Sequence, residues 1–144
     1  MPYLFGHTDV AAQRLQVLAE VFADSTRAFL RQVNRSKLAL AVDLGCGPGL
    51  STRLIAEILR CHHVVGLDTS PHFISLAQQP NADGISFYLH DVTAVPFPVS
   101  PCDLLYCRFL LTHLKQPRDI LEKWATQLRS EGLLLMEEAE WIET

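Results

Sequence analysis

Apolar side chains recur at helical spacing near the start of the chain. Between Thr8 and Val33 they return every three or four positions, with charged and amide residues mostly between them. This period is typical of an amphipathic α-helix with one buried face. The pattern allows one long helix or two shorter ones. We therefore expect residues 1–37 to form an N-terminal helical segment.

From residue 38 onward the pattern changes to five short apolar runs. The runs are LALAVDL, VVGLD, ISFYL, DLLYC and GLLLM. Each has the length of a strand, and continuous apolar character is typical of parallel strands that are buried on both faces. We expect five such strands.

The segments between the runs predict three helices and one loop. Residues 51–60 and 71–79 have helical patterns, and Ser70 is placed to cap the second. The segment TAVPFPVSP predicts a loop because its prolines interrupt a helix. A further helix is expected over residues 117–128, with its end near Gly132.

This alternation predicts an α/β fold with a doubly wound, mostly parallel sheet. We expect a single domain, in which residues 38–144 form the core that follows the N-terminal helical segment. In such sheets, ligands bind at the carboxyl ends of the strands.

Composition narrows the range of functions. The chain has 144 residues, 49% of them apolar, and a net charge of −4 without a dense Lys/Arg run. A globular protein that does not bind nucleic acid is expected. The sequence shows neither a secretion signal nor a membrane span, which predicts a cytoplasmic protein. Four cysteines without a Cys-x-x-Cys pair favour buried thiols, and no residues have metal-ligand spacing.

The first strand runs into a glycine-rich turn, GCGPG, which lets a ligand approach the backbone closely. A dinucleotide fingerprint would need glycine where Leu50 stands, and no Gly-Lys-Ser/Thr follows for a P-loop. Asp43, just before the turn, would repel a pyrophosphate. It suits instead the ammonium end of a cationic ligand such as S-adenosylmethionine.

Acidic residues also end the second and third strands. Asp68 is placed to accept hydrogen bonds from a ribose diol. Asp91 could accept from the adenine amino group while the Val92 amide donates to the ring. Phe73 is expected either to cover the adenine or to pack in the core.

Five segments resemble the motifs of the class I S-adenosylmethionine-dependent methyltransferases, in particular their type 11/12 small-molecule branch. VDLGCGPGLST resembles the first motif, VVGLDTSPHFISLAQ the second and FYLHDVTAVPFP the adenine motif. CDLLYCRFLLTHLKQP and LRSEGLLLMEEAE resemble the segments of the fourth and fifth strands. All five occur in the order and spacing of that family.

The resemblance implies strand order 3-2-1-4-5, S-adenosyl-L-methionine as cofactor and a small-molecule methyl acceptor. With the residues above, it predicts a cofactor site formed by Asp43, Gly45, Cys46, Gly47, Asp68, Thr69, Phe73, Asp91, Val92, Cys107 and Arg108.

Two departures from the family matter. Ser130-Glu131-Gly132 stands where the family usually has Pro-Gly-Gly, and the chain stops at Thr144, before the family's sixth and seventh strands. The fifth strand would then be an exposed edge that invites self-association. A non-catalytic module that binds the cofactor or a partner protein is therefore the alternative to an enzyme.

Methyl transfer mainly requires that the acceptor be aligned with the activated methyl group, and no catalytic residue is assigned. His113, Glu137 and Glu138 are candidates for a general base. Arg108 is better suited to hold a carboxylate. Tyr3 and Arg14 are candidates for the acceptor pocket, because N-terminal segments of the resembling family often cover the site.

Overall fold

The computed structural model describes residues 9–79, 82–108, 110–111 and 114–138, which form one five-stranded parallel sheet with four helices. In chain order the elements are α1 (Asp9–Arg31), β1 (Leu40–Leu44), α2 (Leu50–Leu59), β2 (His63–Asp68), α3 (Pro71–Gln78), β3 (Ile85–Leu89), β4 (Cys102–Arg108), α4 (Pro117–Ala125) and β5 (Leu128–Glu137). The sheet order is β3-β2-β1-β4-β5, so the predicted order is confirmed.

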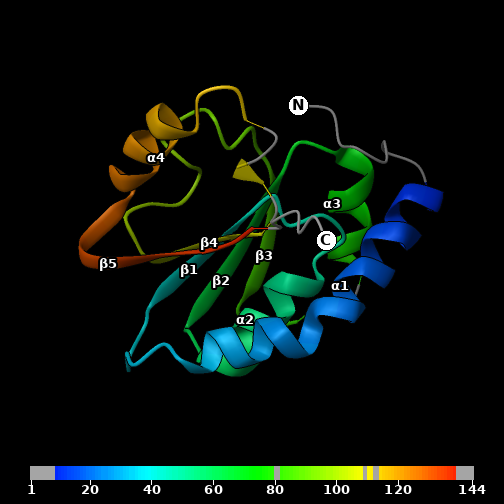
Figure 1. Ribbon diagram of the computed structural model, residues 1–144, viewed down its shortest axis with the longest axis horizontal. Helices are drawn as coiled ribbons and strands as arrows, with labels where there is room; N and C mark the ends of the chain where they lie inside the picture. Colours follow the sequence, from blue (N-terminus) through cyan, green and yellow to red (C-terminus); the bar gives the residue numbers. More distant parts are fainter. Residues whose placement is uncertain (1–8, 80–81, 109, 112–113, 139–144) are drawn as a thin grey trace, which may run out of the picture.

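Helices cover both faces of the sheet (Figure 1). Helices α1, α2 and α3 lie together on one face, and α4 lies on the other. Successive residues of a strand point to opposite faces. Ala41 therefore packs with the buried residues of α1 and α2, while Val42 packs in the cluster that contains Trp124 of α4. The sheet thus separates two apolar cores.

Most of the predicted helices are confirmed. The N-terminal pattern forms the single helix α1, which decides between the two alternatives. At α3 the Ser70 hydroxyl accepts a hydrogen bond of 3.2 Å from the Phe73 amide, as expected of an N-cap. The proline-rich segment between β3 and β4 contains no helix.

The predicted end of the last helix is wrong. Helix α4 ends at Ala125, and Leu128 already pairs with Cys102 as the first residue of β5. The register then shifts, because the next paired residues are Leu104 and Leu133. Glu131, in the unpaired stretch, has a φ of +66°.

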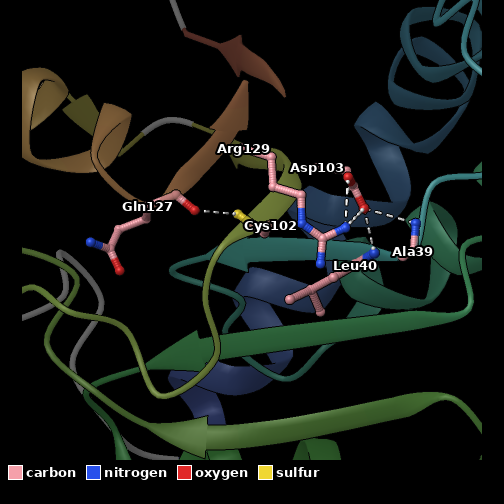
Figure 2. A network of polar contacts seen from close by, with 6 residues as sticks. All are labelled: Ala39, Leu40, Cys102, Asp103, Gln127 and Arg129. Carbon is pink, nitrogen blue, oxygen red and sulfur yellow. Dashed lines mark hydrogen bonds and ion pairs between the residues drawn. The ribbon is translucent and has the colours of Figure 1, made fainter. Parts of the chain in front are cut away.

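A polar network holds this irregular start of β5 to the amino end of the sheet (Figure 2). Asp103 Oδ2 accepts hydrogen bonds of 2.8 and 2.9 Å from the amides of Ala39 and Leu40. Its Oδ1 accepts from Arg129 at 3.2 Å. One carboxylate on β4 therefore anchors both the entry into β1 and the shifted segment of β5.

The expectation that every strand is buried on both faces is wrong for β3 and β5. These are the two edge strands, and Tyr88, Leu89 and Met136 are 41%, 56% and 38% exposed. Apolar runs alone do not distinguish an edge strand from a central one. Among the described residues, no helix is both long enough and apolar enough to cross a membrane.

Candidate functional site

The predicted glycine turn lies at the carboxyl end of β1, beside the end of β2. All three glycines have positive φ: +71° at Gly45, +56° at Gly47 and +97° at Gly49. The Leu67 carbonyl accepts hydrogen bonds from the amides of Gly45 and Cys46 at 2.8 and 2.9 Å. The turn is thus fastened to the neighbouring strand by its own backbone.

The glycines are needed for different reasons. A Cβ atom on Gly49 would lie 2.9 Å from Phe87 Cζ, so this glycine lets α2 pack against β3. A Cβ on Gly45 would make only an ordinary contact with Leu110 at 3.4 Å, and on Gly47 the nearest atom, on Leu15, is 3.9 Å away. The Leu110 side chain therefore covers the Cα side of Gly45, whereas that side of Gly47 meets no atom closer than 3.9 Å.

Asp43, just before the turn, is 1% exposed. Its Oδ2 accepts hydrogen bonds from the Ser51 hydroxyl at 2.6 Å and the Thr52 hydroxyl at 2.7 Å, both on the first turn of α2. Burial raises the pKa of Asp43 to about 6, although the two hydroxyls and the charge of Arg108 act in the opposite direction. The sequence analysis missed Ser51 and Thr52, although their place directly after the glycine turn was a usable signal.

Asp68 connects three backbone segments at the end of β2. Its Oδ2 accepts from the Gly47 amide at 2.8 Å, and its Oδ1 accepts from the Ser70 amide at 2.9 Å. Burial raises its pKa to about 6, against the lowering effect of these amides and that of Thr69. The carboxylate therefore fixes the glycine turn relative to α3, and its bond to a ribose stays a prediction. Thr69 is partly exposed beside it.

At the end of β4, Cys107 is fully buried, whereas Arg108 is partly exposed. Arg108 Nη1 donates to the Thr26 hydroxyl of α1 at 3.1 Å, and Thr26 is fully buried. This contact, which the sequence analysis missed, joins the N-terminal helix to the site. A buried threonine inside an otherwise apolar helix face was the only signal for it.

The residues predicted near the adenine differ in exposure. Asp91 is exposed, and its Oδ1 accepts hydrogen bonds from the amide and hydroxyl of Thr93, which lower the pKa of Asp91. Val92 is buried, and its carbonyl accepts from Trp124 Nε1 at 2.8 Å. Both follow β3, at the same end of the sheet as Asp68.

Phe73 and Cys46 pack into apolar clusters. Phe73 is fully buried against Ala11 and Ala12 of α1, so its ring joins α1 to α3. Core packing was one of the two predictions for Phe73, and the other, a contact with the adenine, stays a prediction. Cys46 packs with Ala77 and Phe87, and burial raises the pKa of its thiol well above the usual range.

The remaining candidates that the structure describes take part in separate contacts. Glu137 accepts from the Tyr106 hydroxyl at 2.6 Å, and Glu138 accepts from the Leu111 amide at 3.0 Å. Arg14 is exposed on the side of α1 that faces away from the sheet, which does not support its predicted place in a pocket. Tyr3 and His113 lie outside the described residues.

Within the part of the chain that the structure describes, no group of three His, Cys, Asp or Glu side chains could hold a metal ion.

Comparison with known proteins agrees with this geometry. A family model described as "Methyltransferase domain" matches residues 42–136. The trans-aconitate 2-methyltransferase of Rhizobium leguminosarum bv. trifolii is 34% identical over 111 residues, which are 77% of this chain and 43% of that protein. The chain therefore spans less than half the length of this curated relative.

Two solved structures share the fold. One is a chain of the complex between the Haloferax volcanii Trm112 methyltransferase activator and a methyltransferase, with a TM-score of 0.74 and 23% identity over 85% of this chain and 54% of that one. The other is an S-adenosylmethionine-dependent methyltransferase from Mesorhizobium loti, with a TM-score of 0.61 and 26% identity over 74% of this chain and 48% of that one.

The sheet order and the glycine turn at the end of β1 are those of a Rossmann-like α/β domain, and the similar solved structures identify it as the class I methyltransferase fold. Since the family model matches more than half of its residues, the chain belongs to the S-adenosylmethionine-dependent methyltransferase domains.

Proposed function

We propose that the chain binds S-adenosylmethionine at the carboxyl ends of β1, β2, β3 and β4 and supports methyl transfer to a small-molecule acceptor. One observation carries the proposal. The buried carboxylates Asp43 and Asp68 flank a glycine turn in which a Cβ atom on Gly47 would meet no atom closer than 3.9 Å.

The charge of these groups favours a cationic ligand. Two buried carboxylates with raised pKa values are costly to ionise, and a nearby positive charge offsets that cost. An anionic pyrophosphate would increase it. In our proposal Asp43 supports the amino-acid end, Asp68 accepts from the ribose hydroxyls, and Asp91 and Val92 contact the adenine.

The chemistry requires little more than alignment. When bound, the cofactor supplies a methyl group that its sulfonium already activates. Arg108, at the end of β4, is our candidate for holding an acceptor carboxylate, because guanidinium groups bind carboxylates with two parallel hydrogen bonds. The name of the relative from Rhizobium leguminosarum, a trans-aconitate methyltransferase, supports an acidic acceptor.

We expect the reaction to take place in the cytoplasm. Cys46, Cys61, Cys102 and Cys107 are all free, which suits a reducing compartment.

Calorimetric titration with S-adenosylmethionine, S-adenosylhomocysteine and a nicotinamide dinucleotide tests the cofactor. Binding of the first two alone is expected, whereas binding of only the dinucleotide would overturn the proposal. Transfer of a labelled methyl group to trans-aconitate then tests the acceptor. Cofactor binding without transfer to any small carboxylic acid would favour the non-catalytic alternative.

A further inference from the structure

Helix α1 exposes a line of side chains on the side opposite the sheet. The apolar members are unusually open for valines: Val10 is 57% exposed, Val17 59% and Val21 69%. Two charged residues and one alanine complete the line, and all are exposed. We call it the α1 stripe, and its residues are Val10, Arg14, Val17, Val21, Asp24 and Ala28.

The α1 stripe lies on one face of the helix. Its spacings of four, three, four, three and four residues are those of the seam of a coiled coil. Ala12, Ala19 and Thr26, spaced by seven, form the buried face toward the rest of the domain. Since residues advance by about 100° along a helix, the two lines lie on opposite sides. The stripe is therefore turned away from the sheet within the described part of the chain.

The spacings between residues of the α1 stripe are the same when read from either end. The two charged residues, Arg14 and Asp24, stand at equivalent positions from the two ends and have opposite charges. When two copies of α1 are laid antiparallel with Val17 of each against Val21 of the other, Arg14 of each faces Asp24 of the other. Val10 then faces Ala28. Asp24 contacts Arg27 of its own helix at 3.3 Å, but its side chain is fully exposed and stays accessible to a second copy.

We propose that the α1 stripe binds a second copy of this chain, with the two helices antiparallel about a twofold axis between Val17 and Val21. A twofold interface must be self-complementary, because each residue i that meets j also places j against i. The stripe meets that condition in both its apolar and its charged positions. The contact would extend about 27 Å, from Val10 to Ala28. Its place on α1 differs from the exposed edge of β5.

Charge reversal gives a sharp test, with sedimentation velocity of the purified chain over a concentration series as the measurement. The wild type should show a monomer–dimer equilibrium. Arg14→Glu or Asp24→Arg alone replaces two attractions with two repulsions, and each should weaken the dimer by about tenfold or more. The double variant restores both pairs and should return the affinity to near that of the wild type.

Mixing the two single variants should also give a heterodimer, because the glutamate introduced in one chain then faces the arginine introduced in the other. Arg118→Glu makes the same charge change at an exposed position of α4 and should leave the dimer unchanged. A circular-dichroism melt of each variant checks that the fold is retained.

Two results would overturn the proposal. One is a wild-type chain that stays monomeric at several hundred micromolar. The other is a dimer that neither single reversal weakens, which would assign association to another surface such as the edge of β5.

Discussion

The Asp68 carboxylate accepts a hydrogen bond of 2.8 Å from the Gly47 amide. The end of β2 thus holds the turn after β1 in place before any ligand arrives. The same carboxylate accepts from the Ser70 amide at the start of α3. A group that we assign to the ribose is therefore also a structural bridge, and its removal should have two separable effects.

Asp68→Ala should weaken binding of S-adenosylhomocysteine by about 1–3 kcal/mol, the range for a hydrogen bond to a charged group. It should also lower the free energy of unfolding, because the buried amides of Gly47 and Ser70 lose their acceptor. Calorimetric titration and urea unfolding measure the two effects separately. Exposed Asp83→Ala is the matched control. An unchanged dissociation constant would exclude Asp68 from the binding site.

Gly49 and Gly47 of the turn should lose different amounts of stability on substitution by alanine. Gly49→Ala combines a positive φ with a contact of 2.9 Å to Phe87, so we expect a loss of about 2–4 kcal/mol in unfolding free energy. Gly47→Ala meets no atom closer than 3.9 Å and should cost about 1–2 kcal/mol from backbone strain alone.

The two variants, Gly47→Ala and Gly49→Ala, should also differ in cofactor binding. The new methyl group of Gly47→Ala occupies the side assigned to the ligand, so the folded variant should bind S-adenosylhomocysteine poorly. Calorimetry under conditions where both variants are folded makes the comparison. Full affinity in Gly47→Ala would mean that the ligand does not approach this side of the turn.

The strands and the place of the turn followed from the sequence, because apolar runs, glycines and prolines act locally, whereas the order of the strands followed from the resemblance to the family. The partners of Asp43 did not follow in the same way. A carboxylate before a glycine turn indicates a ligand, but only the packed start of α2 shows that Ser51 and Thr52 already occupy one of its oxygens. Long-range contacts such as that of Arg108 with Thr26 leave almost no pattern in the sequence.

The prediction of the boundary between α4 and β5 was wrong for a related reason. Leu128 continues the apolar spacing of the helix, so periodicity extended the helix to it. Its pairing with Cys102 across the sheet decides otherwise. Pairing between β4 and β5 here overrides the local helical pattern. The spacing of apolar residues also does not predict the register shift that follows, which the contact between Asp103 and Arg129 stabilises.

Trp124 fixes the segment that follows β3. Its indole is fully buried and donates to the Val92 carbonyl at 2.8 Å. Trp124→Phe keeps much of the packing but leaves this carbonyl without its donor, so unfolding should become easier by about 1–3 kcal/mol. Urea unfolding measures the loss. No change in stability would show that water replaces the indole at no cost.

Stability should fall as pH rises from about 4 to 6. Burial raises the pKa values of Asp43 and Asp68 to about 6, so the folded state holds their protons more tightly than the unfolded state does. The stabilising contribution is complete below about pH 4 and is lost as pH rises through about 6, at roughly 2–3 kcal/mol for each group. Urea unfolding at several pH values should show a smaller decline in Asp43→Asn. An equal decline would mean that Asp43 does not titrate in this window.

Binding of S-adenosylhomocysteine should show the opposite trend, because its ammonium group favours the ionised form of Asp43. At pH 5 this carboxyl is mostly protonated and must release its proton to bind the ligand, so its titration should raise the affinity by up to about tenfold between pH 5 and 7. In Asp43→Asn, affinity should still rise with pH only to the extent that ionisation of Asp68 contributes to binding.

Arg108 provides the sharpest check on that assignment. Its charge lowers the pKa of Asp43, so Arg108→Gln should shift the midpoint of the binding curve to higher pH. Arg118→Gln removes the same charge at an exposed position of α4 and should leave the midpoint unchanged. Titration calorimetry of the three proteins from pH 5 to 8 gives the curves. If Arg108→Gln weakens binding equally at every pH, Arg108 contributes to ligand binding without acting through the pKa of Asp43.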